Sequence, residues 1–446
     1  MVTMHDVALQ LGVESPDARR ETMPAALRGL IVWVLCTLLF ELALIAIAPR
    51  LHSGSVLKLA KDALFLRTGN DGSYYMAQAD LAARQHPNAI YETVFFQRGV
   101  RYIYPPTALL LYRAWQWGAH IGIRPCWLMN GMLVIALWVT LAIAGQFFLD
   151  VAQQPDTVPW RLRHQWLARA LVAWLGLTFL PLVNAYCLGQ MQTLINLAMV
   201  AGVFLWMRGC RATPGVLVGL TCLLKPQASL FLLWGLLRKQ WSFAASFCAV
   251  VAIGLAISVA LFGWHNHVAY LQVIHFLSQR GDSLASNQSW NGLAHRLLRV
   301  GNARFALPTS PYPPYNAIIY WSTLVSSALL VIAAWVVPRV QNAAGGTWDF
   351  LLFAMATVMA SPIAWEHHYG VFFLAFLAWM PVAFRSKGHF AALLAVYWLM
   401  ASTLAPLSGL MLTRWNFLLS HVYWGGLAIF FCTLLRKQDW PLQRSI

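Results

Sequence analysis

The sequence predicts an all-α integral membrane protein that forms a single multi-span helical bundle. The chain has 446 residues, of which 59% are hydrophobic and only 10% charged. Apolar stretches of about 20 residues, the length of a helix that crosses a bilayer, recur along it, for example at 29–48 and 241–262. Helices satisfy their own backbone hydrogen bonds inside lipid, so such stretches assemble into helical bundles.

About twelve candidate spans can be placed on the sequence. Two of them, 214–225 and 226–237, are shorter than a full crossing, and we expect a hairpin around Lys225-Pro226, where proline suits the start of a helix. We expect one membrane domain at 29–435, between a tail at 1–28 and a tail at 436–446. The candidate spans are 29–48, 126–149, 166–183, 191–207, 214–225, 226–237, 241–262, 316–337, 349–363, 368–385, 389–404 and 415–435.

The distribution of basic residues orients the predicted bundle. The polar tail 1–28 carries three arginines before the first span, which favours an uncleaved span that starts in the cytoplasm. Alternating from there, most short cytoplasmic loops are basic, as the positive-inside rule requires. Both tails are then cytoplasmic, and 49–125 and 263–315 form long extracytoplasmic loops. The chain has no eukaryotic retention signal, so we expect a bacterial inner membrane with these loops in the periplasm.

This orientation depends on the segment YPPTALLLYRAWQWGAHIG (104–122). If it were a further span, every later loop would change sides and the basic short loops would face outward. It carries Arg113 at its middle and two tryptophans, a composition typical of an amphipathic helix at the membrane surface. We therefore assign it to the first long loop.

Charge and cysteine content exclude several classes of function. The net charge of +16 is spread over short loops and not gathered into one patch, so no nucleic-acid partner is expected. The seven cysteines are scattered and odd in number, which predicts neither a disulfide framework nor a zinc site, although pairing of Cys126 with Cys187 stays open. Glu41 lies inside the first span, where a carboxylate paired with a neighbour is favoured over an ion or proton site.

Polar motifs gather on the extracytoplasmic side of this topology. A transporter keeps its binding groups near the bilayer midplane, where the predicted spans are almost free of charge. A polar site on one side of a lipid-embedded bundle suits a substrate whose head group reacts at the surface while its tail stays in the membrane. The motifs are NDGSYY (70–75), YPP (104–106), GQMQ (189–192), LKPQ (224–227), SNQSWNG (286–292) and WEHHY (365–369).

The motifs that are missing narrow the range of donors. The sequence has no glycine-rich dinucleotide or nucleotide-phosphate loop and no Asp-x-Asp pair, so neither ATP nor a nucleotide sugar is the expected donor. The histidines of WEHHY are adjacent and point in different directions on a helix, unlike the zinc ligands of HExxH. We predict no metal site and no cofactor, and assistance by a divalent metal stays open.

Taken together, these motifs resemble those of glycosyltransferase family 87, the polyprenyl-phosphate-mannose-dependent mannosyltransferases of the GT-C superfamily. The resemblance covers about residues 60 to 370 and depends on the order of the motifs, which include GLTCLLKPQASLFLLWGLLRKQW (219–241) and SP..W.HHY (361–369). It implies a GT-C fold whose long first outer loop bears amphipathic helices and the catalytic carboxylate. The sequence departs from the family at Gly72, where a bulky apolar residue is more usual, and at Gln192, where asparagine is common.

The resemblance implies inverting transfer of a sugar from a polyprenyl monophosphate to an acceptor hydroxyl outside the cytoplasm. On that resemblance, Asp71 is the base that deprotonates the hydroxyl, in preference to Asp62, Asp80 and Glu92 of the same loop. A positioned carboxylate of this kind contributes about 10²- to 10⁴-fold to the rate.

The other candidate residues surround the phosphate and the sugar. The leaving phosphate gains negative charge, and cations or hydrogen-bond donors aimed at it lower the barrier. A lysine that snorkels at a span end and histidines that pack there are the structural alternatives. The predicted phosphate ligands are Lys225, His367, His368 and Arg280, and the predicted sugar or acceptor contacts are Tyr75, Tyr104, Gln190, Asn287, Gln288, Trp365 and Glu366. Solvation or contact with anionic lipid is expected for Arg98, Arg101, Arg296 and Arg299.

The sequence therefore predicts a membrane enzyme that moves a sugar, mannose on the resemblance, from a polyprenyl-phosphate donor to a glycolipid or glycan acceptor. One alternative is a flippase or transporter of polyprenyl-linked glycans. A second is an oligosaccharide ligase or polymerase that uses a pyrophosphate lipid. The third is a membrane scaffold, which would tolerate alanine at Asp71.

Overall fold

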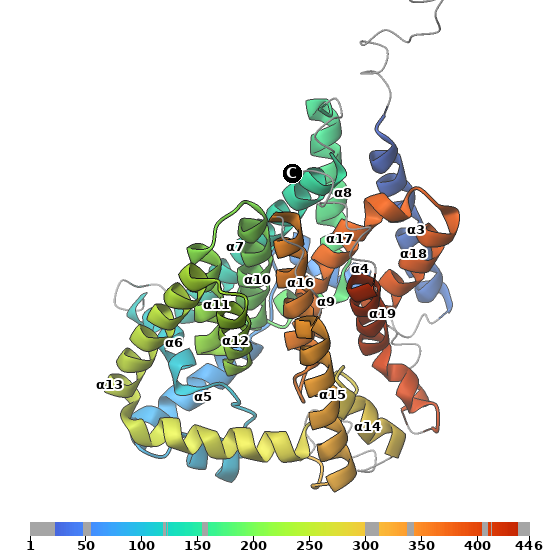
Figure 1. The fold of residues 1–446 in the computed structure, drawn as a ribbon. Coiled ribbons are helices and arrows are strands. Elements are labelled where there is room, and N and C mark those ends of the chain that lie inside the picture. Colours follow the sequence, from blue (N-terminus) through green and yellow to red (C-terminus); the bar gives the residue numbers. More distant parts are fainter. Residues whose placement is uncertain are drawn as a thin grey trace, which may run out of the picture.

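The computed structural model describes residues 23–47, 55–118, 122, 124–153, 159–298, 312–336, 343–403, 409–411 and 413–435. The described part of the chain is helical, without a named strand, which confirms the all-α class (Figure 1). The tail 436–446 and residues 1–22 of the other tail lie outside it. The helices are α3 (Ala25–Ile47), α4 (Val56–Leu64), α5 (Asp71–Gln85), η2 (Glu92–Gln97), η3 (Pro106–Ala108), α6 (Leu109–Trp117), α7 (Pro125–Ala152), α8 (Leu162–Leu177), α9 (Leu180–Cys187), α10 (Gln192–Met207), α11 (Ala212–Leu224), η5 (Pro226–Ser229), α12 (Leu230–Leu237), α13 (Trp241–Arg280), α14 (Trp290–Leu298), α15 (Ala317–Val336), α16 (Ala343–Met359), η7 (Glu366–Val371), α17 (Phe372–Ala383), α18 (Lys387–Ala401), η9 (Asn416–Ser420) and α19 (His421–Leu435).

Five helical segments in the described residues are long and apolar enough to cross a membrane. They are α3, α7, α13, α15 and the segment Asn416–Leu435, and α8 with α9 makes a sixth if this pair, bent by 66°, counts as one span. The integral-membrane class is confirmed, whereas the expected number of about twelve spans is not. Several of the other predicted spans fall on apolar helices of 10–17 residues, and a helix rising 1.5 Å per residue needs about 20 residues to cross the hydrocarbon core.

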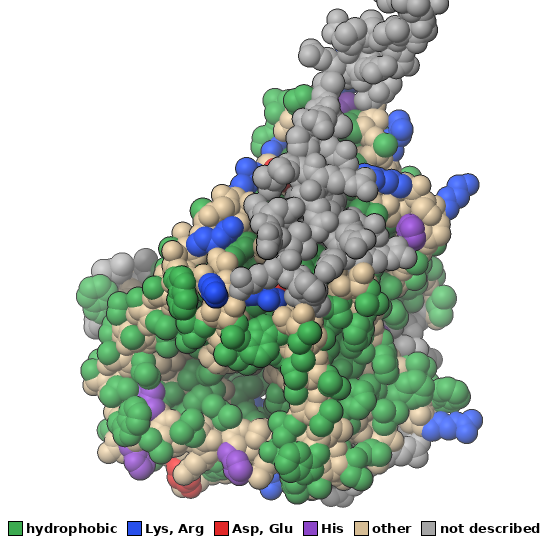
Figure 2. Space-filling model, in the orientation of Figure 1, with side chains coloured by type: hydrophobic (Ala, Val, Ile, Leu, Met, Phe, Trp, Pro, Cys, Tyr) green, Lys and Arg blue, Asp and Glu red, His purple; other side chains and the backbone are tan. Residues whose placement is uncertain are grey.

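The surface divides into an apolar flank and a basic end. Hydrophobic side chains dominate the flank seen in Figure 2, and most visible lysines and arginines lie in the upper half of the view, toward the end where α3 begins. Such an asymmetry is what the positive-inside rule describes. The assignment of this end to the cytoplasm stays a prediction.

Helix α13 differs from its sequence prediction. The expected span ended at 262, but the helix continues to Arg280 after a kink at Gly263, whose φ of +74° is a conformation that favours glycine. The part after the kink crosses the lower edge of Figure 1 as an arm. Asn266 fixes this arm to the first long loop, because its side-chain oxygen accepts a hydrogen bond from the Ile90 amide at 3.1 Å.

The first long loop carries α5 and α6, which are joined by a buried carboxylate. Asp80 of α5 forms ion pairs with Arg84 and with Arg113 of α6, and it accepts a 2.8 Å hydrogen bond from Gln116. Helix α6 covers nine residues, too few to cross a bilayer. The assignment of 104–122 to an extracytoplasmic loop stays a prediction.

Two further carboxylates hold the spans together. Glu41 of α3 accepts a hydrogen bond from Ser402, at the end of α18, which is the paired arrangement favoured from the sequence. Asp349 of α16 accepts two 2.8 Å hydrogen bonds from Arg238 and one of 3.1 Å from the Trp234 indole. The Arg238 and Asp349 side chains are only 11% and 9% exposed, so the pair links α12 to α16 inside the bundle.

Replacing Asp349 with alanine is expected to lower stability by about 3–5 kcal/mol, because the buried guanidinium of Arg238 loses two hydrogen bonds to a carboxylate. Thermal unfolding of the purified protein in one detergent measures the effect. Asp62→Ala is the control, since its pair with Arg67 is long, at 3.7 Å, and the Arg67 side chain is 69% exposed; such a pair contributes less than about 1 kcal/mol. Equal melting temperatures for the two variants would contradict the role of Asp349.

Candidate active site

Asp71, the predicted base, is the first residue of α5. The backbone before and after it pairs with the turn that follows α9, since the amides of Gly69, Asp71 and Gly72 donate to the carbonyls of Cys187, Leu188 and Gly189 at 2.8, 3.1 and 3.0 Å. The motifs NDG and GQ, more than 100 residues apart, therefore lie against each other through their backbones.

Glycine is required on both sides of this contact. A Cβ atom on Gly189 would lie 2.1 Å from the Gly69 carbonyl oxygen, and φ at Gly189 is +69°. A Cβ atom on Gly72 would lie 2.6 Å from the Gly189 carbonyl oxygen. This close approach is a physical reason for the departure from the family at Gly72.

Asp71, Gln190 and Tyr104, three of the predicted residues, form one hydrogen-bonded chain. The Gln190 amide donates to the Asp71 carboxylate, and the Tyr104 hydroxyl donates to the Gln190 side-chain oxygen at 3.0 Å. Gln190 and Tyr104 are buried, and Asp71 is half-buried. Burial raises the pKa of Asp71, an effect that the Gln190 hydrogen bond opposes in part, and a raised pKa strengthens a carboxylate as a base.

Three tyrosine hydroxyls hold the YPP segment that carries Tyr104. Tyr91, Tyr102 and Tyr270 donate to backbone carbonyls within 103–105 at 2.7, 3.3 and 3.2 Å. Tyr91 and Tyr270 were not identified from the sequence, since neither belongs to a motif and one of them lies on the arm of α13. Their hydrogen bonds to the YPP segment depend on contacts between segments that the sequence alone does not place together.

Lys225 lies in the turn between α11 and η5, beside His368 of η7. Its Nζ donates to the Gln192 side-chain oxygen at 2.6 Å and lies 2.6 Å from Nε2 of His368. Burial lowers the pKa of Lys225 to about 7, and burial together with Lys225 holds the pKa of His368 well below its usual range. His368 is therefore neutral and accepts the lysine hydrogen bond, and one of the three N–H donors of the ammonium stays available.

His367 and His368 pack against each other with ring centres 4.9 Å apart. Nε2 of His367 and Nδ1 of His368 are buried without a hydrogen-bond partner among the described residues. Burial, followed by the charge of Lys225, lowers the pKa of His367 to about 3. Gln192 occupies the position where asparagine is common in the family, and it bridges Lys225 to Asn196. Its side-chain oxygen accepts from Lys225, and its side-chain nitrogen donates to the Asn196 side-chain oxygen at 2.9 Å.

A cavity of about 420 Å³ joins several of these groups to an apolar wall. Tyr104, Lys225, Trp365 and His368 contribute polar or aromatic surface. The apolar part includes Leu230 of α12 and, on the arm of α13, Ile274 and Leu277. The cavity thus offers a cation and a neutral imidazole beside a wall that suits hydrocarbon.

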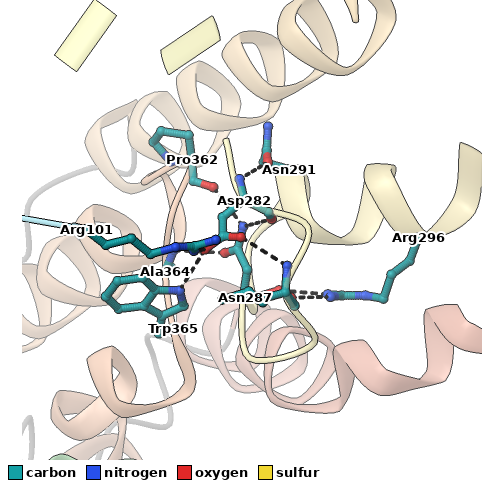
Figure 3. A network of polar contacts seen from close by, with 9 residues as sticks. Arg101, Asp282, Asn287, Asn291, Arg296, Pro362, Ala364 and Trp365 are labelled. Atoms are coloured by element: carbon teal, nitrogen blue, oxygen red, sulfur yellow. Dashed lines mark hydrogen bonds and ion pairs between the residues drawn. The ribbon is translucent and has the colours of Figure 1, made fainter. Parts of the chain in front are cut away.

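Asn287 and Gln288 do not line this cavity. The Asn287 side chain accepts from the Ala364 amide at 3.0 Å and donates to the Asp282 and Pro362 carbonyls at 2.6 and 3.2 Å (Figure 3). The Gln288 side chain donates to two backbone carbonyls and accepts from two backbone amides. Both residues are fully buried and brace the WEHHY segment, and their contact with a sugar stays a prediction.

Of the remaining predicted residues, Trp365 lines the cavity, whereas Glu366, Tyr75 and Arg280 do not. Trp365 has its ring centre 5.6 Å from those of His367 and His368. Glu366 is next to it, and burial raises the pKa of its carboxyl to about 7. Tyr75 follows Asp71 by one helical turn, and Arg280 lies over the Phe276 ring at 4.6 Å; neither lines the cavity, so their predicted contacts also stay predictions.

The expectation of solvated arginines was wrong for Arg101 and Arg296. Arg101 pairs with the buried Asp282 at 3.0 Å, and Arg296 is 6% exposed and donates to the Leu284 and Asn287 carbonyls. Arg98 is exposed, as expected, and Arg299 lies outside the described residues. The error has a physical reason: carbonyls and carboxylates from distant segments compensate the buried charges, and the sequence alone does not show which segments meet.

Comparison with known proteins adds a family match. The model of glycosyltransferase family 87 matches residues 102–362, a region that includes Tyr104, Gln190 and Lys225 but not Asp71 or the two histidines. The chain is 27% identical over 328 residues to the polyprenol-phosphate-mannose-dependent alpha-(1-2)-phosphatidylinositol mannoside mannosyltransferase of Mycobacterium tuberculosis, covering 71% of this chain and 67% of that protein. The protein of the same name from Mycolicibacterium smegmatis is 24% identical over 327 residues, with the same coverage. No solved structure matches the chain significantly.

Gly189→Ala is expected to destabilise the protein by about 1–3 kcal/mol more than Gly99→Ala, because the new methyl group must separate the two backbones that hold Asp71. Gly99 is the matched control, since its φ of +66° imposes the same strain on alanine, but a Cβ atom there meets nothing within 4 Å. Thermal unfolding of both variants under identical conditions gives the difference. A loss no larger at 189 than at 99 would show that the close approach is unimportant.

Proposed function

The chain belongs to glycosyltransferase family 87 and is an integral-membrane glycosyltransferase, and we propose that it transfers mannose from polyprenyl-phosphate mannose to a hydroxyl group of a glycolipid. The names of its mycobacterial relatives support this donor, and they support a phosphatidylinositol mannoside or a similar glycolipid as acceptor. The observation that carries the proposal is the Lys225–His368 pair in a cavity with an apolar wall, which Tyr104 and Gln190 link to a separate half-buried carboxylate.

In this proposal, the donor phosphate lies against Lys225 and His368. The free N–H of the lysine and the Nδ1–H of the neutral imidazole donate to phosphate oxygens. Leu230, Ile274 and Leu277 contact the first isoprene units, which continue from the cavity into the surrounding lipid. As the glycosidic bond breaks, these donors stabilise the charge that develops on the phosphate.

Asp71 acts as the general base on the side of the sugar opposite the phosphate. Its carboxylate takes the proton of the acceptor hydroxyl as the hydroxyl oxygen attacks C1 of the sugar. The bond between C1 and the phosphate oxygen breaks, its electron pair stays on polyprenyl phosphate, and the configuration at C1 inverts. Gln190, held by Tyr104, orients the carboxylate.

The cavity favours a monophosphate donor over a pyrophosphate. Among the described residues that line it, Lys225 alone has a side chain that is cationic at its ordinary pKa. A pyrophosphate-dependent ligase would place at least one more negative charge there. We also propose that the site faces the periplasm and that both tails are cytoplasmic, on the basis of the positive-inside pattern.

Asp71→Asn is expected to reduce turnover by about 10²- to 10⁴-fold, because the amide cannot accept the hydroxyl proton. The assay uses protein in lipid nanodiscs with polyprenyl-phosphate mannose and a mixture of acceptor glycolipids, and measures released polyprenyl phosphate by mass spectrometry. Asp62→Asn, in the same loop, is the control and should keep wild-type turnover. Undiminished release by Asp71→Asn would retain the donor and exclude Asp71 as the base, whereas no release by the wild type, with any polyprenyl-phosphate sugar, would overturn the proposed function.

The pH dependence of kcat/KM for the donor should show two limbs, with activity lost in acid and in alkali. Activity is lost as the pH falls through the raised pKa of Asp71, because the base becomes protonated. It also declines as the pH rises through about 7, because Lys225 is a cation only below its pKa. Lys225→Arg keeps the charge at all these pH values and should move the alkaline limb upward.

Glu366, whose pKa is also about 7, is the competing explanation for the alkaline limb. Glu366→Gln should leave the position of this limb unchanged, whatever its effect on the rate. A limb that moves in Glu366→Gln but not in Lys225→Arg would assign it to the carboxyl group.

A further inference from the structure

We propose that Asp282 is a positioning residue of the donor cavity: its carboxylate fixes the indole of Trp365 in the cavity wall and ties that wall to Arg101 of the first long loop. The inference rests on the proposed function, because Trp365 matters for donor binding only if the cavity holds the donor. Asp282 belongs to none of the motifs that carry the family resemblance.

Asp282 is 1% exposed and connects three separate segments (Figure 3). Oδ2 accepts from Nη1 of Arg101 at 3.0 Å and from the Trp365 indole nitrogen at 3.3 Å. Oδ1 accepts from the amide of Leu284 at 3.1 Å, which fixes the carboxylate to its own loop. Both oxygens of the carboxylate are thus occupied, and its orientation is determined.

The backbone around Asp282 is equally constrained. Gly281 ends α13 with a φ of +64°, and a Cβ atom there would lie 1.8 Å from the Asn291 side chain, so the chain can turn only with glycine at this position. The turn places Asp282 directly after the arm whose residues Ile274 and Leu277 line the cavity. The Asn291 side chain accepts from the Asp282 amide at 3.2 Å, and Asn287 donates to its carbonyl at 2.6 Å.

Fixing the indole of Trp365 has a consequence for the phosphate ligands. Trp365 and His368 both line the cavity, and their ring centres are 5.6 Å apart. A tryptophan whose N–H is bound to a buried carboxylate cannot rotate without losing a charge-assisted hydrogen bond. Asp282 therefore fixes the position of Trp365 in the cavity wall beside His368 without itself lining the cavity.

Arg101 extends this constraint toward the base. It precedes the YPP segment, and Tyr104 of that segment is hydrogen-bonded through Gln190 to Asp71. The guanidinium also lies over the Tyr312 ring at 4.5 Å, so it is held on two sides. The Arg101–Asp282 ion pair thus connects the loop that carries the base with the wall that faces the donor.

The chain contains a matched set of groups outside this cavity. Asp349 also accepts from an arginine and from a tryptophan indole, at 2.8 Å from Arg238 and 3.1 Å from Trp234. None of these three residues lines the donor cavity. Asp349→Asn therefore removes the same kind of interaction as Asp282→Asn without disturbing the cavity wall.

The test compares Asp282→Asn with Asp349→Asn in nanodiscs, using polyprenyl-phosphate mannose and release of polyprenyl phosphate. Asparagine keeps the shape but loses the charge that holds the indole, so Asp282→Asn should raise the donor KM by about tenfold and change kcat less than about threefold. Asp349→Asn should leave KM within about twofold of the wild type. Trp365→Phe should raise KM similarly, and the double variant Asp282→Asn with Trp365→Phe should be no worse than either single variant.

Hydrogen–deuterium exchange gives a readout that does not depend on turnover. Amides of residues 361–369 should exchange faster in Asp282→Asn than in the wild type and at the wild-type rate in Asp349→Asn. Any one of three kinetic results would overturn the proposal: a wild-type KM in Asp282→Asn, an equal rise of KM in Asp349→Asn, or additive effects of Asp282→Asn and Trp365→Phe. If the wild type released no polyprenyl phosphate, the proposed function would fail, and unchanged exchange in Asp282→Asn would reject the positioning role separately.

Discussion

The candidate site depends on a half-buried lysine ammonium that has no carboxylate partner among the described residues. Lys225 is held by a glutamine oxygen and a histidine nitrogen, and no ion pair joins it to an acid in the described part of the chain. Burying such a charge is unfavourable, which explains why burial lowers the pKa of Lys225 to about 7. A phosphate of the donor would supply the missing negative charge, favour the protonated lysine and offset the cost of burial. The two histidines stay neutral beside the lysine and can serve as hydrogen-bond donors without repelling it.

The helix breaks that reduce the number of full-length spans are also what create the site. The turn after α9 presents Gln190, and the turn between α11 and η5 presents Lys225. Irregular backbone at membrane depth is tolerated only where it is buried in protein or lines a cavity, because each free amide or carbonyl would otherwise face lipid. The carbonyls of the first turn are paired with the backbone before and within the NDG motif, which satisfies this requirement and places Asp71. Both turns lie between spans predicted from the sequence, which also predicts a hairpin at Lys225-Pro226, but the sequence does not show the 66° bend between α8 and α9.

Much of this arrangement could be predicted from the sequence, because the polar motifs are local and stand out against apolar surroundings. The chain of Asp71, Gln190 and Tyr104 and the pair of Lys225 and His368 consist of residues identified in that way. The tyrosines that hold the YPP segment, the continuation of α13 beyond Gly263 and the burial of Arg101 could not be predicted. Each of them depends on contacts between segments far apart in the chain, and a tyrosine, a glycine or an arginine by itself has several ordinary explanations.

Tyr104 connects the cavity proposed for the donor with the residues that hold the proposed base. It lines the donor cavity, while its hydroxyl group donates to Gln190, which in turn donates to Asp71. Inversion at C1 requires the acceptor oxygen to approach from the side opposite the leaving phosphate, so the base and the phosphate ligands must lie on opposite sides of the sugar. Asp71 and the Lys225–His368 pair are separate groups; Tyr104 is linked to the first through Gln190 and lines the same cavity as the second. A sugar between them would contact the Tyr104 ring, and this is the physical basis for expecting Tyr104 and Gln190 to select the sugar while the apolar wall of the cavity selects the lipid.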